Sequence, residues 1–212
     1  MLSRDELNLK LARMRELDPE LRVFGASTHR YKLNEPTQEP ALTRFEEDSG
    51  ARIPEDYRDF LLRFGDGGAG PFYGLLSLEQ IRKEYDNEYP VRMIGNPFCI
   101  PESANSECAY TVEGTIPLCH FGCGSMAVII AFGIERGNIW GYCNDDRVRP
   151  ETNETPIYPE NSTLELRLKI NEEFDEKMLR DRSLRLTFWQ WYEDWVDKCL
   201  SSSYLTFPKR KV

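Results

Sequence analysis

The chain has 212 residues, enough for one large domain with its own hydrophobic core. Its 36 acidic and 27 basic residues give a formal net charge of −9, which disfavours nucleic acid and anionic membranes as partners and favours cationic ones. Hydrophobic residues make up 40% of the chain, too many for a disordered protein. The longest apolar run, residues 126–134, is about half of the roughly 18 residues that span a bilayer, which excludes a transmembrane helix.

The N-terminus carries acidic residues and no apolar core segment, so it does not resemble a secretory signal, and we expect a cytoplasmic protein. Six cysteines are too few for a disulfide scaffold of this length, and we expect most of them to be free thiols in a reducing compartment. The six are Cys99, Cys108, Cys119, Cys123, Cys143 and Cys199.

Helical patterns dominate the first part of the chain. Apolar residues at helical spacing predict an opening helix over residues 5–17, followed by a connecting segment without periodicity up to residue 39. Two helices are predicted next, over residues 39–48 with Gly50 as a left-handed exit, and over residues 54–64 with a buried aromatic stripe.

A glycine-rich loop at residues 65–71 precedes a third predicted helix. Ser77 and Gln80 have the spacing of a capping box, which predicts a helix from Leu78 to about Asn87. Thr187 and Gln190 show the same spacing before a final helix with a stripe of aromatic residues.

The middle of the chain is rich in β-branched and aromatic residues separated by glycines, which predicts strands at residues 115–118, 126–132 and 138–142, the last two as a hairpin. Strict alternation of apolar and charged residues over 164–170 predicts a further, half-buried strand. Helices first, strands in the middle and a helix last favour an α+β fold with a central, mainly antiparallel sheet flanked by helices.

The order of these motifs is familiar. The stretch 53–68, followed by Gly70-Pro71 and Gly74-Leu75, resembles the SUKH superfamily, also called the Smi/Knr family. The segments 116–118, 122–125 and 137–140 and the aromatic last helix fit the same order, so the resemblance covers roughly residues 41–200.

The resemblance implies a single α+β domain over residues 41–200, with an N-terminal helix and connecting segment at 1–40 and a short basic tail at 201–212. It also implies a binding module without chemistry of its own. Bacterial members of this superfamily are mostly immunity proteins that bind and neutralise a cognate toxin, often a nuclease. Fungal members act in regulatory assemblies, which is the alternative function. The N-terminal 40 residues and the stretch 148–181 depart from the family pattern.

Catalytic and metal-binding interpretations have little support. His120 lies between Cys119 and Cys123, but a catalytic thiol needs a base oriented by a third group, and the sequence indicates none, so a turn residue is the simpler interpretation. Cys143 could join these three as a zinc ligand, although the paired close spacing of structural zinc sites is missing. The second histidine, His29, lies in polar surroundings. We predict no catalytic residue, metal or cofactor.

Three further features have two interpretations each. The loop at residues 65–70 could cradle phosphate, but it follows a helix and lacks the Gly-Lys-Ser/Thr ending, which favours a helix C-cap and tight turn. Asp145 and Asp146 could act as paired carboxylates, but adjacent side chains of an extended segment point apart, which favours a solvated loop. The Trp-rich last helix could be a partner face, but its single stripe favours the core.

The charge distribution suggests a binding surface. Between Gly95 and Asp146 there are six acidic residues and one basic residue, Arg136, and an acidic surface of this kind can dock into a cationic cleft. We therefore predict a cationic protein partner, such as a toxin domain, and no nucleic acid or membrane partner. The residues predicted to reach it are Asp66, Tyr73, Glu84, Asp86, Glu88, Asp145 and Asp146.

Overall fold

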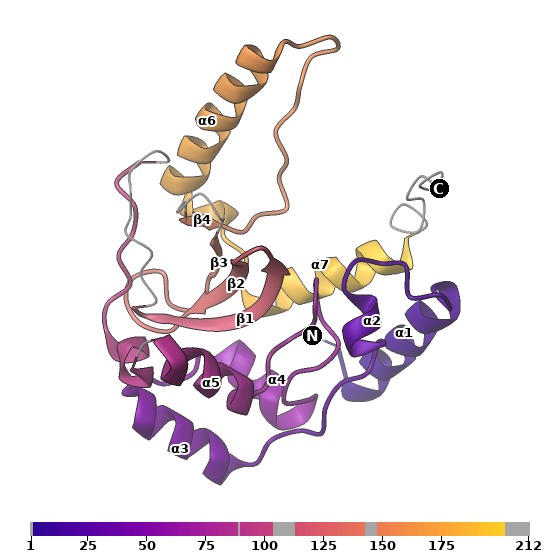
Figure 1. The fold of residues 1–212 in the computed structure, drawn as a ribbon, viewed down its shortest axis with the longest axis vertical. Coiled ribbons are helices and arrows are strands. Elements are labelled where there is room, and N and C mark those ends of the chain that lie inside the picture. Colours follow the sequence, from indigo (N-terminus) through magenta and orange to yellow (C-terminus); the bar gives the residue numbers. More distant parts are fainter. Residues whose placement is uncertain (1, 89, 104–112, 143–147, 202–212) are drawn as a thin grey trace.

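The computed structural model describes residues 2–88, 90–103, 113–142 and 148–201 (Figure 1). Over these residues the chain forms helices, short 3₁₀ helices and strands in the order α1 (Arg4–Leu17), α2 (Ala26–His29), α3 (Glu39–Ser49), α4 (Glu55–Arg63), α5 (Leu78–Glu88), η1 (Val91–Gly95), β1 (Thr115–Gly122), β2 (Ser125–Ile130), β3 (Ile139–Tyr142), β4 (Val148–Pro150), α6 (Leu164–Arg180), η2 (Arg182–Leu184) and α7 (Phe188–Leu200). Within the described part of the chain, no helix is long and apolar enough to cross a membrane.

The four strands form one antiparallel sheet in the order β1-β2-β3-β4. Val128 of β2 lies opposite Trp140 of β3, so the predicted hairpin is confirmed, and Gly141 lies opposite Arg149 of β4. The predicted α+β class with a mainly antiparallel sheet is confirmed as well.

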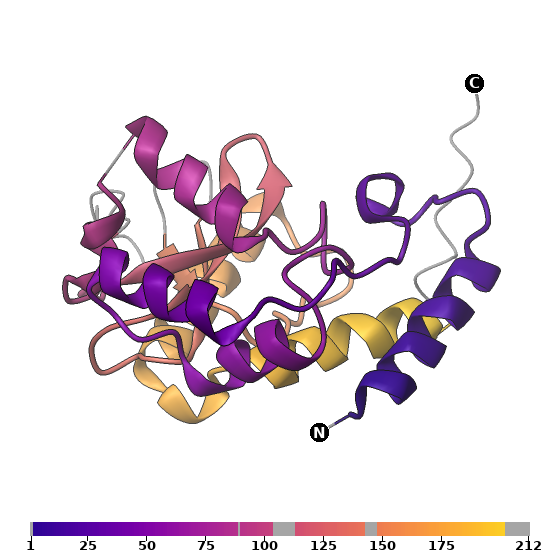
Figure 2. The ribbon, with the colours of Figure 1, turned by 90° about the horizontal axis from the view of Figure 1, so that it is seen from below.

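The sheet separates two hydrophobic clusters, because successive side chains of a strand point to opposite faces. One face contributes Ile129 and Ile139 to the large cluster that also contains residues of α4 and α7. The other face contributes Val128 and Trp140 to a small cluster that Leu179 of α6 packs against. Figures 1 and 2 show α7 running along the sheet and on to α1.

Local signals in the sequence account for several helix ends. Gly50 ends α3 with a φ of 71°, the left-handed exit that was predicted. Ser77 and Gln80 form the predicted capping box before α5, with each side chain accepting from the other residue's backbone N–H. Thr187 and Gln190 form the same box before α7. Each box satisfies two backbone N–H groups at the start of its helix.

The strand predicted at residues 164–170 is wrong, because this segment is the first half of α6. Thr163 accepts a hydrogen bond from the backbone N–H of Leu166 and caps the helix. At 100° per residue, Leu164 and Leu168 share one helix face, so alternating leucines also satisfy the i, i+4 pattern of a helix. Leucine, glutamate, lysine and arginine are strong helix formers with little β preference. In this segment their helix propensity outweighs the strand-like alternation of apolar and charged residues.

The N-terminal helix α1 packs along α7 and contributes Leu7, Leu11 and Met14 to the large cluster. Lys10 of α1 also forms an ion pair of 3.1 Å with Asp197 of α7. In the described part of the chain, nothing in the packing separates residues 2–40 from the rest of the core, and a boundary at residue 40 stays a prediction.

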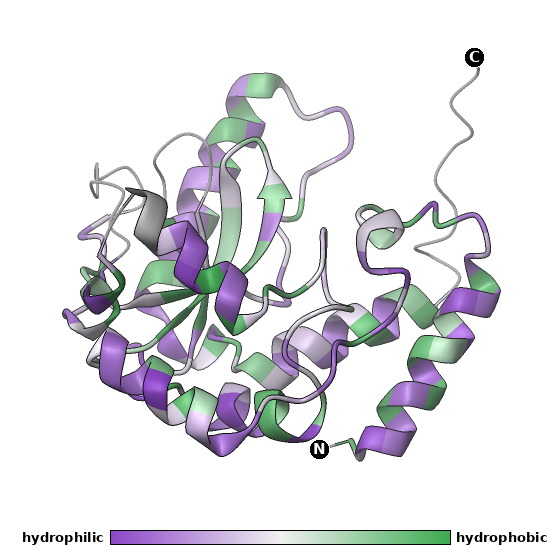
Figure 3. Ribbon diagram, turned by 60° about the horizontal axis from the view of Figure 1, so that its bottom comes forward, coloured by the Kyte–Doolittle hydropathy of each residue, from purple (hydrophilic) through white to green (hydrophobic). Residues whose placement is uncertain are grey.

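The last helix is a core element, as its aromatic stripe predicts. Phe188, Trp191, Tyr192, Trp195 and Cys199 are all buried. In contrast, α6 extends away from the body of the molecule, and Figure 3 shows apolar residues along it as well as on the strands.

Candidate protein-binding surface

The glycine loop after α4 forms a tight turn held on both sides. Gly68 has a φ of 98° and exchanges backbone hydrogen bonds of 2.8 and 2.9 Å with Leu75. A Cβ at Gly68 would lie 2.6 Å from the carbonyl oxygen of Lys32, so only glycine fits this position. The hydroxyl of Tyr192 in α7 donates to the Ala69 carbonyl at 2.8 Å. The predicted tight turn is confirmed, and it carries Phe72 and Tyr73 to the surface.

The far end of this loop lies against the N-terminal segment. Phe72 has a φ of 52°, a left-handed conformation that aromatic residues rarely adopt. Its carbonyl oxygen would lie 1.7 Å from a Cβ at Gly25, so the close approach of the two backbones requires glycine there. Segment 23–39, predicted only as a connection, therefore helps to position the loop.

Exposed aromatic rings gather where these segments meet. Phe24, Phe72 and Tyr73 are 50%, 36% and 40% exposed. The ring centroids of Phe24 and Tyr73 lie 5.1 Å apart, and those of Phe72 and the partly buried Phe121 of β1 lie 3.9 Å apart. These four residues are called the aromatic surface. A contiguous exposed apolar patch of this kind is typical of an interaction site.

The aromatic surface borders a histidine–glutamate pair. The backbone N–H of Tyr73 donates to the His120 carbonyl of β1 at 3.4 Å. On the same residue, Nε2 lies 3.2 Å from Oε1 of Glu84 in α5, and both side chains are partly exposed. The structure thus brings two of the predicted residues, Tyr73 and Glu84, to the same strand residue.

Asp66 has a structural partner. Its Oδ1 accepts a hydrogen bond of 2.8 Å from the backbone N–H of Leu78, the first residue of α5. Burial raises the pKa of this carboxyl above its ordinary value. Asp66 therefore caps α5, a role that no local sequence signal predicts.

The side chains of the other predicted residues lie outside the described part of the structure. Asp86 and Glu88 belong to the last turn of α5, but their side chains lie outside the described part of the structure. Asp145 and Asp146 lie outside the described residues altogether. Their contact with a partner stays a prediction.

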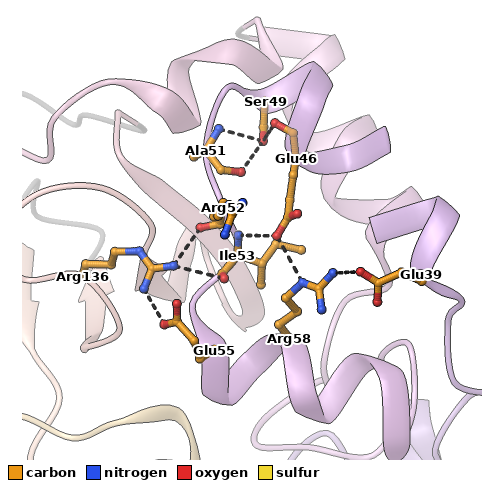
Figure 4. Close-up of polar contacts among 9 residues, drawn as sticks. All are labelled: Glu39, Glu46, Ser49, Ala51, Arg52, Ile53, Glu55, Arg58 and Arg136. Carbon is orange, nitrogen blue, oxygen red and sulfur yellow. Dashed lines mark hydrogen bonds and ion pairs between the residues drawn. The ribbon is translucent and has the colours of Figure 1, made fainter. Parts of the chain in front are cut away.

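Arg136 is the one basic residue of the acidic stretch 95–146. Its side chain contacts the segment at the start of α4 (Figure 4). Its guanidinium donates to Glu55 at 2.6 Å and to the carbonyls of Arg52 and Ile53 at 3.3 and 3.2 Å. The same loop is held from the other side, because Glu46 accepts from the backbone N–H of Ile53 at 3.0 Å. Arg136 therefore ties the sheet to the start of α4.

Glu135, one of the six acidic residues of that stretch, lies in the interior. It is 1% exposed and accepts from Arg185 at 3.0 Å, and Arg182 lies 3.1 Å from its other oxygen. Arg185 also stacks over the Trp140 ring at 5.1 Å. This carboxylate holds η2 against the sheet and adds nothing to an acidic surface.

The histidines and cysteines show no convergent site among the described residues. His29 is buried, its Nδ1 accepts from the backbone N–H of Tyr31 at 3.1 Å, and burial lowers its pKa to about 4. Burial raises the pKa of the Cys119 thiol, whereas Cys123 is exposed at the β1–β2 turn. No group of three or more His, Cys, Asp or Glu side chains is placed to hold a metal in the described residues, and Cys143 lies outside them.

Comparison with protein families decides the classification. The model of the SMI1 / KNR4 family (SUKH-1) matches residues 36–179, well over half of the chain. The chain belongs to this family. No curated protein matches it. The SMI1 / KNR4 match includes the glycine loop, Tyr73 and Glu84 and ends within α6, so α7 packs into the core from outside the matched residues.

Membership in the SMI1 / KNR4 family supports a protein-interaction module of the immunity type, in a family that is generally non-catalytic. Phe24 and Phe121 were not predicted as surface residues. A local signal for Phe24 exists, because an aromatic residue beside Gly25 in a segment without periodicity has no place in a predicted core stripe.

Proposed function

We propose that this chain is an immunity protein that binds a cognate bacterial toxin in the cytoplasm and neutralises it stoichiometrically, without chemistry of its own. The observation that carries the proposal is the aromatic surface beside Glu84, in a chain of the SMI1 / KNR4 family. Interfaces derive most of their affinity from a few aromatic anchors surrounded by polar residues, and this surface has that composition.

The net charge supports a cationic toxin, for example a nuclease, as the partner. A chain of net charge −9 attracts basic proteins over long range, and acidic residues around an aromatic centre increase the association rate. Glu84 is the described member of that acidic rim, and Asp86, Glu88, Asp145 and Asp146 are its predicted members.

The test uses the purified full chain and any basic toxin domain that a gene beside its own encodes. We expect a 1:1 complex, loss of toxin activity at equimolar immunity protein, and slower association at high salt. Tyr73→Ala should weaken the complex about tenfold or more, and Glu84→Lys should slow association.

Matched controls are available on other faces. Tyr158 is 40% exposed, as is Tyr73, so Tyr158→Ala removes an equally exposed ring from the segment before α6. Glu47→Lys on α3 makes the same charge change as Glu84→Lys. Equal effects of the controls would contradict the proposed surface. A native-extract pull-down that recovers only signalling or housekeeping proteins, with no effect on any neighbouring toxin, would instead favour the regulatory role of the fungal relatives.

A further inference from the structure

A small pocket opens next to the aromatic surface, between the glycine loop and α7. Its volume is about 110 Å³, and Phe72, Glu151, Trp191 and Trp195 contribute to its wall. Pockets for whole small-molecule ligands usually measure about 300–1,000 Å³. This pocket is therefore too small for a nucleotide or a cofactor and matches the end of one long side chain.

The wall of the pocket combines aromatic rings with a carboxylate. Trp191 and Trp195 lie one turn apart on α7, and Phe72 faces them from the glycine loop. The Glu151 side chain lies over β3, where a Cβ at Gly141 would be 2.8 Å from its Oε1. Glycine at this position therefore leaves room for the carboxylate on the sheet.

Two further charged residues at the rim neutralise each other. Nζ of Lys198 lies 2.5 Å from Oδ2 of Asp194, one turn before it on α7. Glu151 forms no ion pair of this kind among the described residues, although Lys198 and Asp194 act on its carboxyl in opposite directions. Its carboxyl is therefore the acceptor left for a ligand in this pocket. A cation that enters would meet indole rings and a carboxylate together.

We propose that this pocket receives the side chain of an arginine from the protein partner. A guanidinium is planar and weakly hydrated, stacks on indole rings and binds carboxylates with two parallel hydrogen bonds. The proposal rests on the proposed function, because it identifies how a cationic toxin would be anchored beside the aromatic surface. Phe72 belongs to both, which makes the pocket and that surface one continuous interface.

The arginine pocket is tested without the toxin, so this proposal and the proposed function can fail separately. The probes are the peptide acetyl-Gly-Gly-Arg-Gly-Gly-amide and its lysine and citrulline analogues, titrated against the ¹⁵N-labelled full chain. We expect the arginine peptide to shift the indole N–H signals of Trp191 and Trp195 with a dissociation constant in the roughly millimolar range, as befits a single anchoring side chain. The neutral citrulline peptide, which has the same shape, should bind at least about fivefold more weakly.

Two variants should change the affinity in opposite directions. Glu151→Gln removes the carboxylate charge and should weaken the arginine peptide at least fivefold, as estimated from the strength of charge-assisted hydrogen bonds. Lys198→Met removes the cation that neutralises Asp194 and should tighten binding by about the same factor. The matched controls are Glu160→Gln, in the same segment, and Lys169→Met, which breaks the equivalent ion pair with Glu173 on α6.

Several outcomes would overturn the proposal. Equal binding of the citrulline peptide would show that charge does not matter, and tighter binding of the lysine peptide would assign the pocket to an ammonium group. Equal effects of the control variants would remove the pocket as the site. If replacing Lys209, Arg210 and Lys211 together by glutamine increased the affinity, the chain's own basic end would be the occupant. Peptide binding without any toxin partner would contradict the proposed function alone.

Discussion

The consecutive helices α6 and α7 carry similar local sequence signals, but their apolar side chains differ in burial. Both begin after a capping threonine and both are rich in large apolar residues. In α7, Phe188, Trp191 and Tyr192 are buried. In α6, Leu164 and Leu168 remain 74% and 59% exposed.

The difference comes from what lies opposite each helix. α7 contacts α1 and α4 along its length, so its rings enter the large cluster. α6 contacts β4 near its C-terminal end, where Met178 is buried and Asp175 pairs with Arg149 at 3.2 Å. Apolar residues at helical spacing thus specify a helix, while burial depends on neighbours contributed by distant segments.

The largest expected effect concerns the ring at the start of α7. Phe188→Ala should destabilise the protein by about 3–5 kcal/mol, because its ring packs 5.0 Å from both Tyr57 and Phe60 and its loss leaves a cavity. Urea unfolding followed by circular dichroism measures the change. A cost below 1 kcal/mol would mean that α7 is less tightly packed than its burial indicates.

The next effect concerns Glu151, which lies between the two helices and lines a pocket with each. Burial raises its pKa from 4.5 to about 7, with Lys198 and Asp194 acting in opposite directions. Because its pKa is raised in the folded state, the contribution of Glu151 to stability is fully present below pH 4.5 and is lost as the pH rises through 7.

Wild type should therefore lose about 2 to 3 kcal/mol between pH 5 and pH 8 that Glu151→Gln does not lose, at 1.36 kcal/mol per pKa unit. Urea unfolding of both proteins at the two pH values measures this difference, and other titrating groups, such as His29, cancel in the comparison. Parallel pH profiles would show that the carboxyl is better solvated than its position indicates.

The two capping threonines provide a smaller and more direct comparison. Thr187→Ala should cost about 1 kcal/mol of global stability, because α7 unfolds only with the core. Thr163→Ala removes the same kind of cap but should leave global stability nearly unchanged, since the first turns of α6 can open locally. Amide hydrogen exchange should instead show faster exchange at the start of α6. Equal global costs would mean that α6 folds as part of the core.

The smallest expected effect is on the exposed face of α6. Leu168→Gln should change the free energy of unfolding by less than about 0.5 kcal/mol, because the side chain is mostly in water in the folded protein as well. Chemical denaturation measures this, with Phe188→Ala as the contrasting variant. A cost of 2 kcal/mol or more would indicate that a second molecule covers this face in solution.

Part of the candidate site could be predicted from local sequence. Tyr73 follows a glycine-rich loop, whose composition predicts a tight turn. Glu84 lies on α5, whose start is predicted by the capping-box spacing of Ser77 and Gln80. Asp66 also caps α5 twelve residues further on, a contact that depends on how the loop folds back, and its predicted contact with a partner stays a prediction. Glu135 was counted as acidic surface, yet two arginines from after α6 hold it inside.

The sequence by itself determined the α+β class, the capping boxes before α5 and α7 and the hairpin, because the boxes and the hairpin depend on side chains within a few residues of one another. Residues 164–170 were wrongly predicted as a strand, because their alternation fits both a strand and a helix and only helix propensity distinguishes the two. Tertiary structure alone decided which apolar residues remain exposed. The aromatic surface joins residues 24, 72, 73 and 121, and the pocket joins residue 72 to residues 151, 191 and 195. Such groupings arise because packing brings together residues whose separation in the chain no local pattern records.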